Sequence, residues 1–281
     1  MFSTALVALD LSPAERPIID CVPALAGWGV RRAVLCHVVR VGYAQGGDLA
    51  KAQDYSDWLE KCAAPVRDAG MDVAVEIRSG GVIEDEILAA AAQAQADLIV
   101  VGSRGRNVVA RMFLGSVARA LLHKATTPVL MEWVEPTAAA TQSNCEAVCT
   151  DTLRHIVVAT DFSVDAAAAE HAAIRLASQA QRIDALHVAP SADSTVWRLS
   201  PEATQAALAG LAARIREAGG TGGTVILEGV ASEEIARYAT THDVSLIVVG
   251  KHGRGRLSDK LIGSTAARVC EIAGRPVLMV P

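Results

Sequence analysis

Short runs of apolar residues alternate along the chain with longer stretches that repeat at the helical period. The runs lie near residues 4–9, 32–39, 72–77, 97–101 and 128–132, and again near 155–159, 182–188, 223–227, 245–249 and 276–280. Helical stretches begin at Pro13 and cover about 50–69, 82–95 and 116–124. Runs such as Leu-Ile-Val-Val at 98–101 are apolar at every position, which is typical of parallel strands covered by helices on both faces. The pattern predicts an α/β fold with a doubly wound parallel sheet.

The chain contains the same pattern twice. Asp-Leu-Ile-Val-Val-Gly at 97–102 recurs as Ser-Leu-Ile-Val-Val-Gly at 245–250, and Thr-Pro-Val-Leu-Met at 127–131 recurs as Arg-Pro-Val-Leu-Met at 275–279. Near the start of each half, Leu-Asp10-Leu-Ser corresponds to Thr-Asp161-Phe-Ser. Such self-similarity indicates duplication of one domain. We expect a first domain at 1–133, a linker at 134–152 and a second domain at 153–281.

The expected linker is polar and has no apolar periodicity, so an exposed excursion suits it better than a regular element. It carries Cys145 and Cys149, four residues apart and without a Cys-x-x-Cys or Cys/His pair. We interpret these two as structural or incidental and assign no metal ligands. Cys21, Cys36, Cys62 and Cys270 lie in apolar segments and are expected to be small buried side chains.

Composition excludes several classes of protein. Hydrophobic residues make up 51% of the 281 positions, which predicts a buried core rather than disorder. The formal net charge of −5 disfavours nucleic acid as a partner. No apolar run is long enough to span a membrane, and the N-terminus lacks the basic segment and cleavage site of a signal peptide. We therefore expect a cytoplasmic protein.

A glycine pattern follows the fourth predicted strand of each half. It reads Gly-x₂-Gly-x₉-Gly-Ser, with Gly102, Gly105, Gly115 and Ser116 in the first half and Gly250, Gly253, Gly263 and Ser264 in the second. Glycines at a strand end let backbone N–H groups approach an anion, and the final Gly-Ser opens a helix whose N-terminus favours phosphate. The alternative is ordinary turn chemistry with serine as a helix cap. The repetition of the full spacing favours phosphate binding.

Basic residues are concentrated in both glycine loops. Arg104, Arg106 and Arg111 lie in the first loop, and the second holds Lys251, Arg254, Arg256 and Lys260. In an acidic chain this local reversal of charge favours a polyphosphate, although long basic side chains also occur on ordinary surface loops. We assign Arg106 and Arg254, which directly follow the second glycine of each loop, to the candidate phosphate site.

Other polar residues lie at the same predicted sheet edge. Asp10 and Asp161 end the first strand of each half, where a carboxylate either accepts hydrogen bonds from a ribose or an adenine amine, or caps the following helix. His37 and His187 are expected to be hydrogen-bonded core residues, with the backbone of Val38 and Val188 available to an adenine edge. We interpret the lone histidines, His123 and His252, as facing solvent.

Together these segments resemble the universal stress protein family in its tandem form, over nearly the whole chain outside the linker. The resemblance implies two Rossmann-like domains of the adenine nucleotide alpha hydrolase-like type, each with a five-stranded parallel sheet of order 3-2-1-4-5. It also implies pairing of domains through their last strands, as a homodimer or within one chain as a pseudo-dimer. The first half departs from the usual pattern in carrying Leu9 before its aspartate, whereas the second carries Thr160.

The resemblance implies one ATP site in each half, with Mg²⁺ as a companion ion. Asp10 and Val38 would hold the adenosine, and Gly102, Gly105, Gly115 and Ser116 the ribose and phosphates. Asp161, Val188, Gly250, Gly253, Gly263 and Ser264 would do the same in the second half.

Three functions remain open from the sequence. The first is a stress-response regulatory protein that signals through bound ATP, because no Ser/His/Asp set, metal cluster or water-activating carboxylate is evident near the loops. The second is a slow ATPase or self-phosphorylating enzyme, which needs little beyond Mg²⁺ and positioning. The third is an interaction scaffold that binds no nucleotide.

Overall fold

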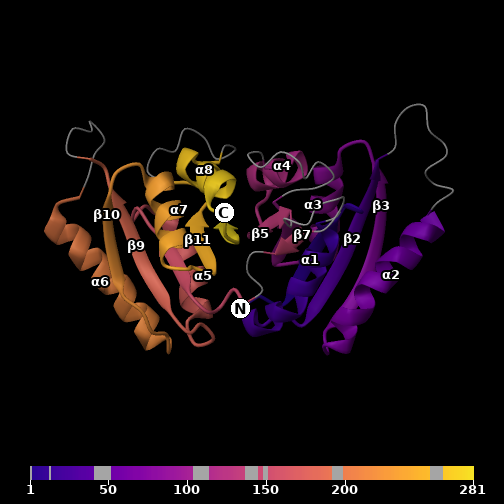
Figure 1. Ribbon diagram of the computed structural model, residues 1–281, viewed down its shortest axis with the longest axis horizontal. Coiled ribbons are helices and arrows are strands. Elements are labelled where there is room, and N and C mark those ends of the chain that lie inside the picture. The colour runs from indigo at the N-terminus through magenta and orange to yellow at the C-terminus, as the bar shows by residue number, and fades with distance from the viewer. Residues whose placement is uncertain are drawn as a thin grey trace. The chain divides into compact units, whose positions relative to one another are not determined.

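A computed structural model describes residues 2–12, 14–40, 52–103, 114–136, 145–147, 151–191, 199–253 and 262–281. The chain divides into two compact units, Phe2–Thr150 and Asp151–Pro281. Each unit is an α/β domain with a parallel sheet, as the apolar runs predict (Figure 1).

The first unit contains five parallel strands in the order β3-β2-β1-β4-β5. Its helices form two pairs in contact, α1 with α2 and α3 with α4. The strands are β1 (Thr4–Leu9), β2 (Arg32–Arg40), β3 (Asp72–Gly80), β4 (Leu98–Gly102) and β5 (Val129–Glu132), and the helices are α1 (Glu15–Cys21), the 3₁₀ helix η1 (Val22–Trp28), α2 (Ala52–Asp68), α3 (Ile83–Gln93) and α4 (Ser116–Lys124).

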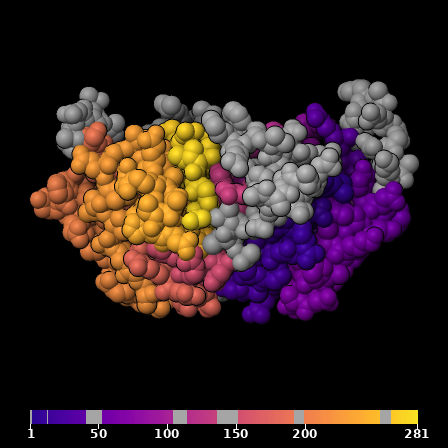
Figure 2. Space-filling model, viewed as in Figure 1, coloured from indigo at the N-terminus to yellow at the C-terminus, as the bar shows by residue number. Residues whose placement is uncertain are grey.

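The second unit repeats this arrangement, with the order β10-β9-β8-β11-β12. Helices α5 and α6 contact each other, and so do α7 and α8. Figure 2 shows the orange atoms of α7 next to the yellow atoms at the C-terminal end of the chain. The strands are β8 (Ile156–Ala159), β9 (Ile183–Ala189), β10 (Thr224–Glu228), β11 (Leu246–Gly250) and β12 (Val277–Val280), and the helices are α5 (Ala166–Leu176), α6 (Pro201–Glu217), α7 (Ala231–Thr241) and α8 (Ser264–Ile272).

Each core is built on the all-apolar strands. Residues Leu98, Ile99, Leu246 and Ile247 have no exposed surface, because helices cover both faces of each sheet. Cys21, Cys36, Cys62 and Cys270 are buried, as expected. Burial raises the pKa of the Cys36, Cys62 and Cys270 thiols to about 12. These thiols therefore act as packing groups rather than nucleophiles.

Two local features differ from the sequence expectation. The helix expected from Pro13 is shorter as an α-helix and continues as η1, which has Pro23 in its first turn and ends at Gly29 with φ of 94°. Proline has no N–H for the α-helical hydrogen bond, so the tighter helix is accommodated there. The linker, expected to hold no regular element, contains the antiparallel pair β6 (Val134–Pro136) and β7 (Cys145–Ala147), and β7 contacts α1.

No helix among the described residues is long and apolar enough to cross a membrane.

Candidate functional site

The candidate site of each half lies where the strand order reverses, between the carboxyl ends of β1 and β4 or of β8 and β11. In doubly wound sheets this edge is where ligands bind. It is also where the glycine loops of the sequence begin, because Gly102 ends β4 and Gly250 ends β11.

The base of each glycine loop is closed by the same pair of backbone hydrogen bonds. In the first half Ser103 N–H donates to Glu132 O (2.8 Å) and Gly115 N–H donates to Ser103 O (2.9 Å). In the second half Lys251 N–H donates to Val280 O (2.7 Å) and Gly263 N–H to Lys251 O (2.8 Å). The helix after the loop is therefore fixed to the end of the strand before it.

Helices α4 and α8 begin without a side-chain cap. Their N-cap residues are Gly115 and Gly263, both with ψ of 144°, and in the part of the chain that the structure describes no side chain caps either helix. Ser116 and Ser264, the first helical residues, are exposed. Each helix thus presents N–H groups and the positive end of its dipole at the sheet edge, an arrangement that suits a phosphate.

The strand-end aspartates form the same turn in both halves. Asp10 Oδ1 accepts from Ser12 N–H (3.1 Å), and Asp161 Oδ1 accepts from Ser163 N–H (3.0 Å). The residues between them, Leu11 and Phe162, have φ of 57° and 59°, a conformation that side chains disfavour. Repeated strain at one turn is typical of functional positions.

The serines that follow these aspartates bond backbone groups closer to the helices. Ser12 Oγ accepts from Ala14 N–H (3.3 Å), and Ser163 Oγ accepts from Ala166 N–H (3.1 Å). The aspartates therefore shape the turn that precedes the helix instead of capping its first residues.

In the second half the aspartate and the glycine loop meet. A Cβ on Gly253 would lie 2.6 Å from Asp161 Oδ2, so a side chain at this position would displace the carboxylate. Gly250 is nearly as restricted, since a Cβ there would lie 3.2 Å from Asp165 O. The matching residue Gly105, and the assigned Arg106 and Arg254, lie outside the described residues, as do Arg104, Arg111, Arg256 and Lys260.

Val38 and Val188 lie just past the end of the neighbouring first strand. The register between β1 and β2 ends at Leu9 and His37, while β2 continues along β3 through Val38 to Arg40. In the second half the register between β8 and β9 ends at Ala159 and Leu186, so Val188 also lies beyond the paired part. Both valines therefore lie beyond the part of β2 or β9 that pairs with the first strand of its half.

The strand histidines are core residues, as expected. His37 Nδ1 lies 2.8 Å from Leu9 O, and His187 Nδ1 lies 2.8 Å from Thr160 O. Each imidazole thus supports the residue directly before the strand-end aspartate.

Two residues of the second loop lie differently from the expectation. Lys251 is not on a surface loop: only 4% of it is exposed, and this burial lowers the pKa of its ammonium. His252 is not turned fully to solvent, because its Nε2 is buried and has no hydrogen-bond partner among the described residues. No pattern in the sequence indicates the burial of either residue, since both lie in a polar, glycine-rich stretch.

Comparisons with known proteins agree with the duplication. A model of the "Universal stress protein family" matches residues 1–131 and 152–281. A universal stress protein of Mycolicibacterium smegmatis is 29% identical over 220 residues, which cover 75% of this chain and 69% of the relative. Universal stress protein A homolog 1 of Coxiella burnetii is 30% identical over 140 residues, covering 46% of this chain and 95% of the relative.

Solved structures match the fold over both halves. A universal stress protein from Archaeoglobus fulgidus is 20% identical, has a TM-score of 0.74 and covers 99% of this chain and 95% of its own. A structure described as a putative universal stress protein from Pseudomonas aeruginosa is also 20% identical, with a TM-score of 0.68 and coverage of 99% and 93%.

Proposed function

The chain belongs to the universal stress protein family, and we propose that each half binds one adenine nucleotide at the carboxyl edge of its sheet. The phosphates lie at the N-terminus of α4 or α8. The ribose and adenine lie toward Asp10 and Val38 in the first half and toward Asp161 and Val188 in the second.

One feature found in both halves carries this proposal. A helix that begins at a glycine N-cap follows a glycine loop, and backbone hydrogen bonds join the two ends of that loop. A duplicated turn with a purely structural role has no need of exposed helix N–H groups, because serine or aspartate at the N-cap would satisfy them. Gly115 and Gly263 instead leave those groups open. The contact between Gly253 and Asp161 supports the same assignment, since a side chain there would displace the carboxylate.

We assign ATP as the nucleotide, with Mg²⁺ as its companion ion, and a regulatory role. Among the described residues no group of three or more His, Cys, Asp or Glu side chains is placed to hold a metal ion, so the nucleotide itself would supply most ligands of Mg²⁺. ATP-dependent signalling, as a homodimer or an internal pseudo-dimer in the cytoplasm, follows from the family resemblance and stays a prediction.

Release of bound small molecules tests the proposal. The purified chain is denatured, the supernatant is chromatographed, and the emptied protein is titrated calorimetrically with ATP and with GTP. We expect adenine nucleotide in the supernatant, or binding of ATP in preference to GTP on titration. Absence of nucleotide together with no heat of binding at millimolar ATP would contradict the proposal and favour a scaffold.

Phosphate release measured on the same protein separates a regulator from a slow ATPase. A binding protein without catalysis gives the same rate as buffer containing Mg²⁺ and ATP. A rate above that background, lost when the loop glycines are replaced, would move the assignment to a slow ATPase.

A further inference from the structure

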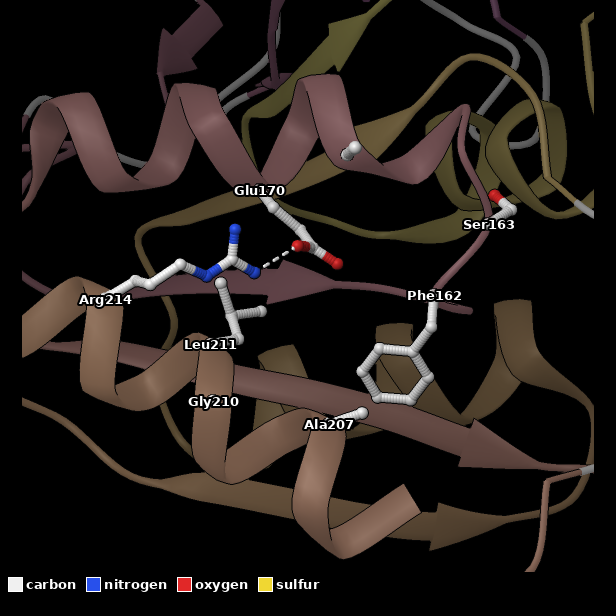
Figure 3. Close-up of a pocket in the computed structure, with 8 residues that line it drawn as sticks. Phe162, Ser163, Glu170, Ala207, Gly210, Leu211 and Arg214 are labelled. Atoms are coloured by element: carbon white, nitrogen blue, oxygen red, sulfur yellow. Dashed lines mark hydrogen bonds and ion pairs between the residues drawn. The ribbon is translucent and has the colours of Figure 1, made fainter. Parts of the chain in front are cut away.

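A pocket of about 470 Å³ opens between α5 and α6 of the second half, beside the candidate nucleotide site but formed by different residues. Figure 3 shows its two walls, with Phe162 on one side and the Glu170–Arg214 pair on the other. Small side chains of α6 lie between them. The lining residues are Phe162, Ser163, Ala167, Glu170, Ala207, Gly210, Leu211 and Arg214.

The polar wall holds a cation with spare hydrogen-bond donors. Glu170 is 7% exposed; its Oε1 accepts from Thr160 Oγ1 (2.7 Å) and its Oε2 from Arg214 Nη2 (2.6 Å). The Arg214 side chain is 45% exposed, and this ion pair is its single polar contact among the described residues. A guanidinium has five N–H donors, so most of them stay available at the rim of the pocket.

The apolar wall is an aromatic ring held in place. Phe162 stacks on His187, with ring centroids 5.0 Å apart, and Phe162 N–H donates to Thr160 Oγ1 (2.9 Å). Thr160 therefore joins the two walls, because its hydroxyl accepts from Phe162 and donates to Glu170. The ring presents a fixed flat surface that suits an aromatic ligand.

The first half shows what this pocket replaces. Helices α2 and α6 each have 17 residues and are followed by Gly70 and Gly219 with φ of 89° and 86°, which fixes their alignment. In that alignment Leu59 matches Leu208, and both have no exposed surface.

Trp58 then matches Ala207. The indole of Trp58 lies 5.3 Å from the His37 ring, centroid to centroid, and its Nε1–H donates to Glu15 Oε1 (2.8 Å). Beside the strand histidine the first half therefore has the indole of Trp58, whereas in the second half the ring of Phe162 stacks on His187 and the matching helix position is only a methyl group, Ala207, which lines the pocket.

The ion pair is also specific to the second half. Counting from the paired strand-end aspartates, Glu170 matches Ile19, and the helix alignment matches Arg214 with Pro65. The first half therefore packs the same two helices without this ion pair. Because the Arg214 side chain is 45% exposed, the pair contributes little to stability, so a role for Arg214 and Glu170 other than folding accounts better for their presence.

We propose that this pocket binds a small aromatic carboxylate, with its ring between Phe162 and Ala207 and its carboxylate on the free N–H groups of Arg214. Volume, a fixed aromatic face and one cation with unused donors are the features of a site for such a ligand. The site is separate from nucleotide binding and does not depend on it. A ligand in the pocket would contact Phe162, which is the residue after Asp161, and would in this way affect the conformation of the turn at Asp161.

Fluorine NMR with 4-fluorobenzoate tests this assignment on the full chain, with 4-fluorobenzyl alcohol as the uncharged probe. Fluorobenzoate is expected to bind the wild-type protein, which broadens its fluorine resonance. Its affinity is expected to be the same in saturating ATP. Ala207→Trp, which installs the residue of the first half, is expected to abolish binding. Arg214→Gln is expected to weaken fluorobenzoate at least about tenfold, the loss of one charge-assisted pair, and to leave the alcohol unchanged.

Arg216→Gln is the matched control, because Arg216 is an exposed arginine of the same helix outside the pocket, and its binding should equal that of wild type. Melting temperatures of all variants identify any that fail to fold. Three results would each overturn the proposal. The first is no binding by wild type at millimolar probe in 10-fold molar excess, which is roughly the weakest affinity expected for so few atoms. The others are equal binding by folded Ala207→Trp and displacement of the probe by ATP.

Discussion

Replacing Gly115 and Gly263 together with aspartate is expected to abolish nucleotide binding while leaving both domains folded. Aspartate is a favoured N-cap, and the extended backbone at both positions suits it. Its carboxylate would take the helix N–H groups and set a negative charge where the phosphates belong. A Cβ at Gly263 would lie 3.3 Å from Lys251 O, which needs only a small adjustment. We expect at least ~100-fold weaker ATP binding by calorimetry, from lost dipole attraction and added repulsion.

The corresponding asparagine variant separates the two causes. Asparagine occupies the N–H groups in the same way but adds no charge, so its affinity should fall between that of wild type and that of the aspartate variant. Raising the salt concentration should narrow the difference between the two variants, because salt screens the exposed charge. Unchanged ATP affinity in a folded aspartate variant would place the phosphates elsewhere.

Asp184→Ala is expected to destabilise the second domain by about 3–5 kcal/mol, the loss typical of breaking a buried ionic network on one side. Asp184, in β9, has no exposed surface, and its carboxylate accepts from His155 Nε2 (2.8 Å), Arg182 Nε (3.0 Å) and the Gly223 N–H (2.9 Å). The variant leaves these donors without their acceptor. Denaturant unfolding with hydrogen exchange read by mass spectrometry should show faster exchange in residues 183–189 and unchanged exchange in the first domain.

The same carboxylate makes the second domain acid-sensitive. Burial raises the pKa of Asp184, but hydrogen bonds from His155, Arg182 and the Gly223 N–H outweigh it and hold the pKa well below its ordinary range. A carboxyl whose pKa is depressed in the folded state contributes stability that is complete above its unfolded pKa of about 4 and is lost as the pH falls below it.

Arg182→Gln, which removes one exposed partner, should lower the free energy of unfolding much less than Asp184→Ala does. Equal stability of Asp184→Ala and wild type would contradict this account of the network.

The fold was readable from the sequence because its strands are apolar at every position. Leu98 to Val101 and Leu246 to Val249 are covered on both faces, and repetition of these runs identifies the second domain without any knowledge of packing. The paired glycine spacing also identified the sheet edge, since glycines after buried strands mark the ends where parallel strands meet.

Three-dimensional contacts of single side chains were not readable in the same way. Burial of Lys251 and of His252 Nε2 depends on which groups pack around the end of β11, and a polar, glycine-rich stretch does not encode that packing locally. The pocket beside Phe162 goes with several differences between the halves, among them Trp58 against Ala207 and the Glu170–Arg214 ion pair, and only the folded chain shows that these residues line one space. Careful alignment of the two helices would have shown the difference, but not the space it creates.

Native mass spectrometry of the chain with added ATP is the most direct test of the duplicated phosphate site. The account predicts up to two ATP molecules on each chain, one on each single variant, Gly115→Asp or Gly263→Asp, and none on the double variant. Two ATP molecules retained by the folded double variant would contradict it, because the helix N-termini would then have no part in holding the phosphates.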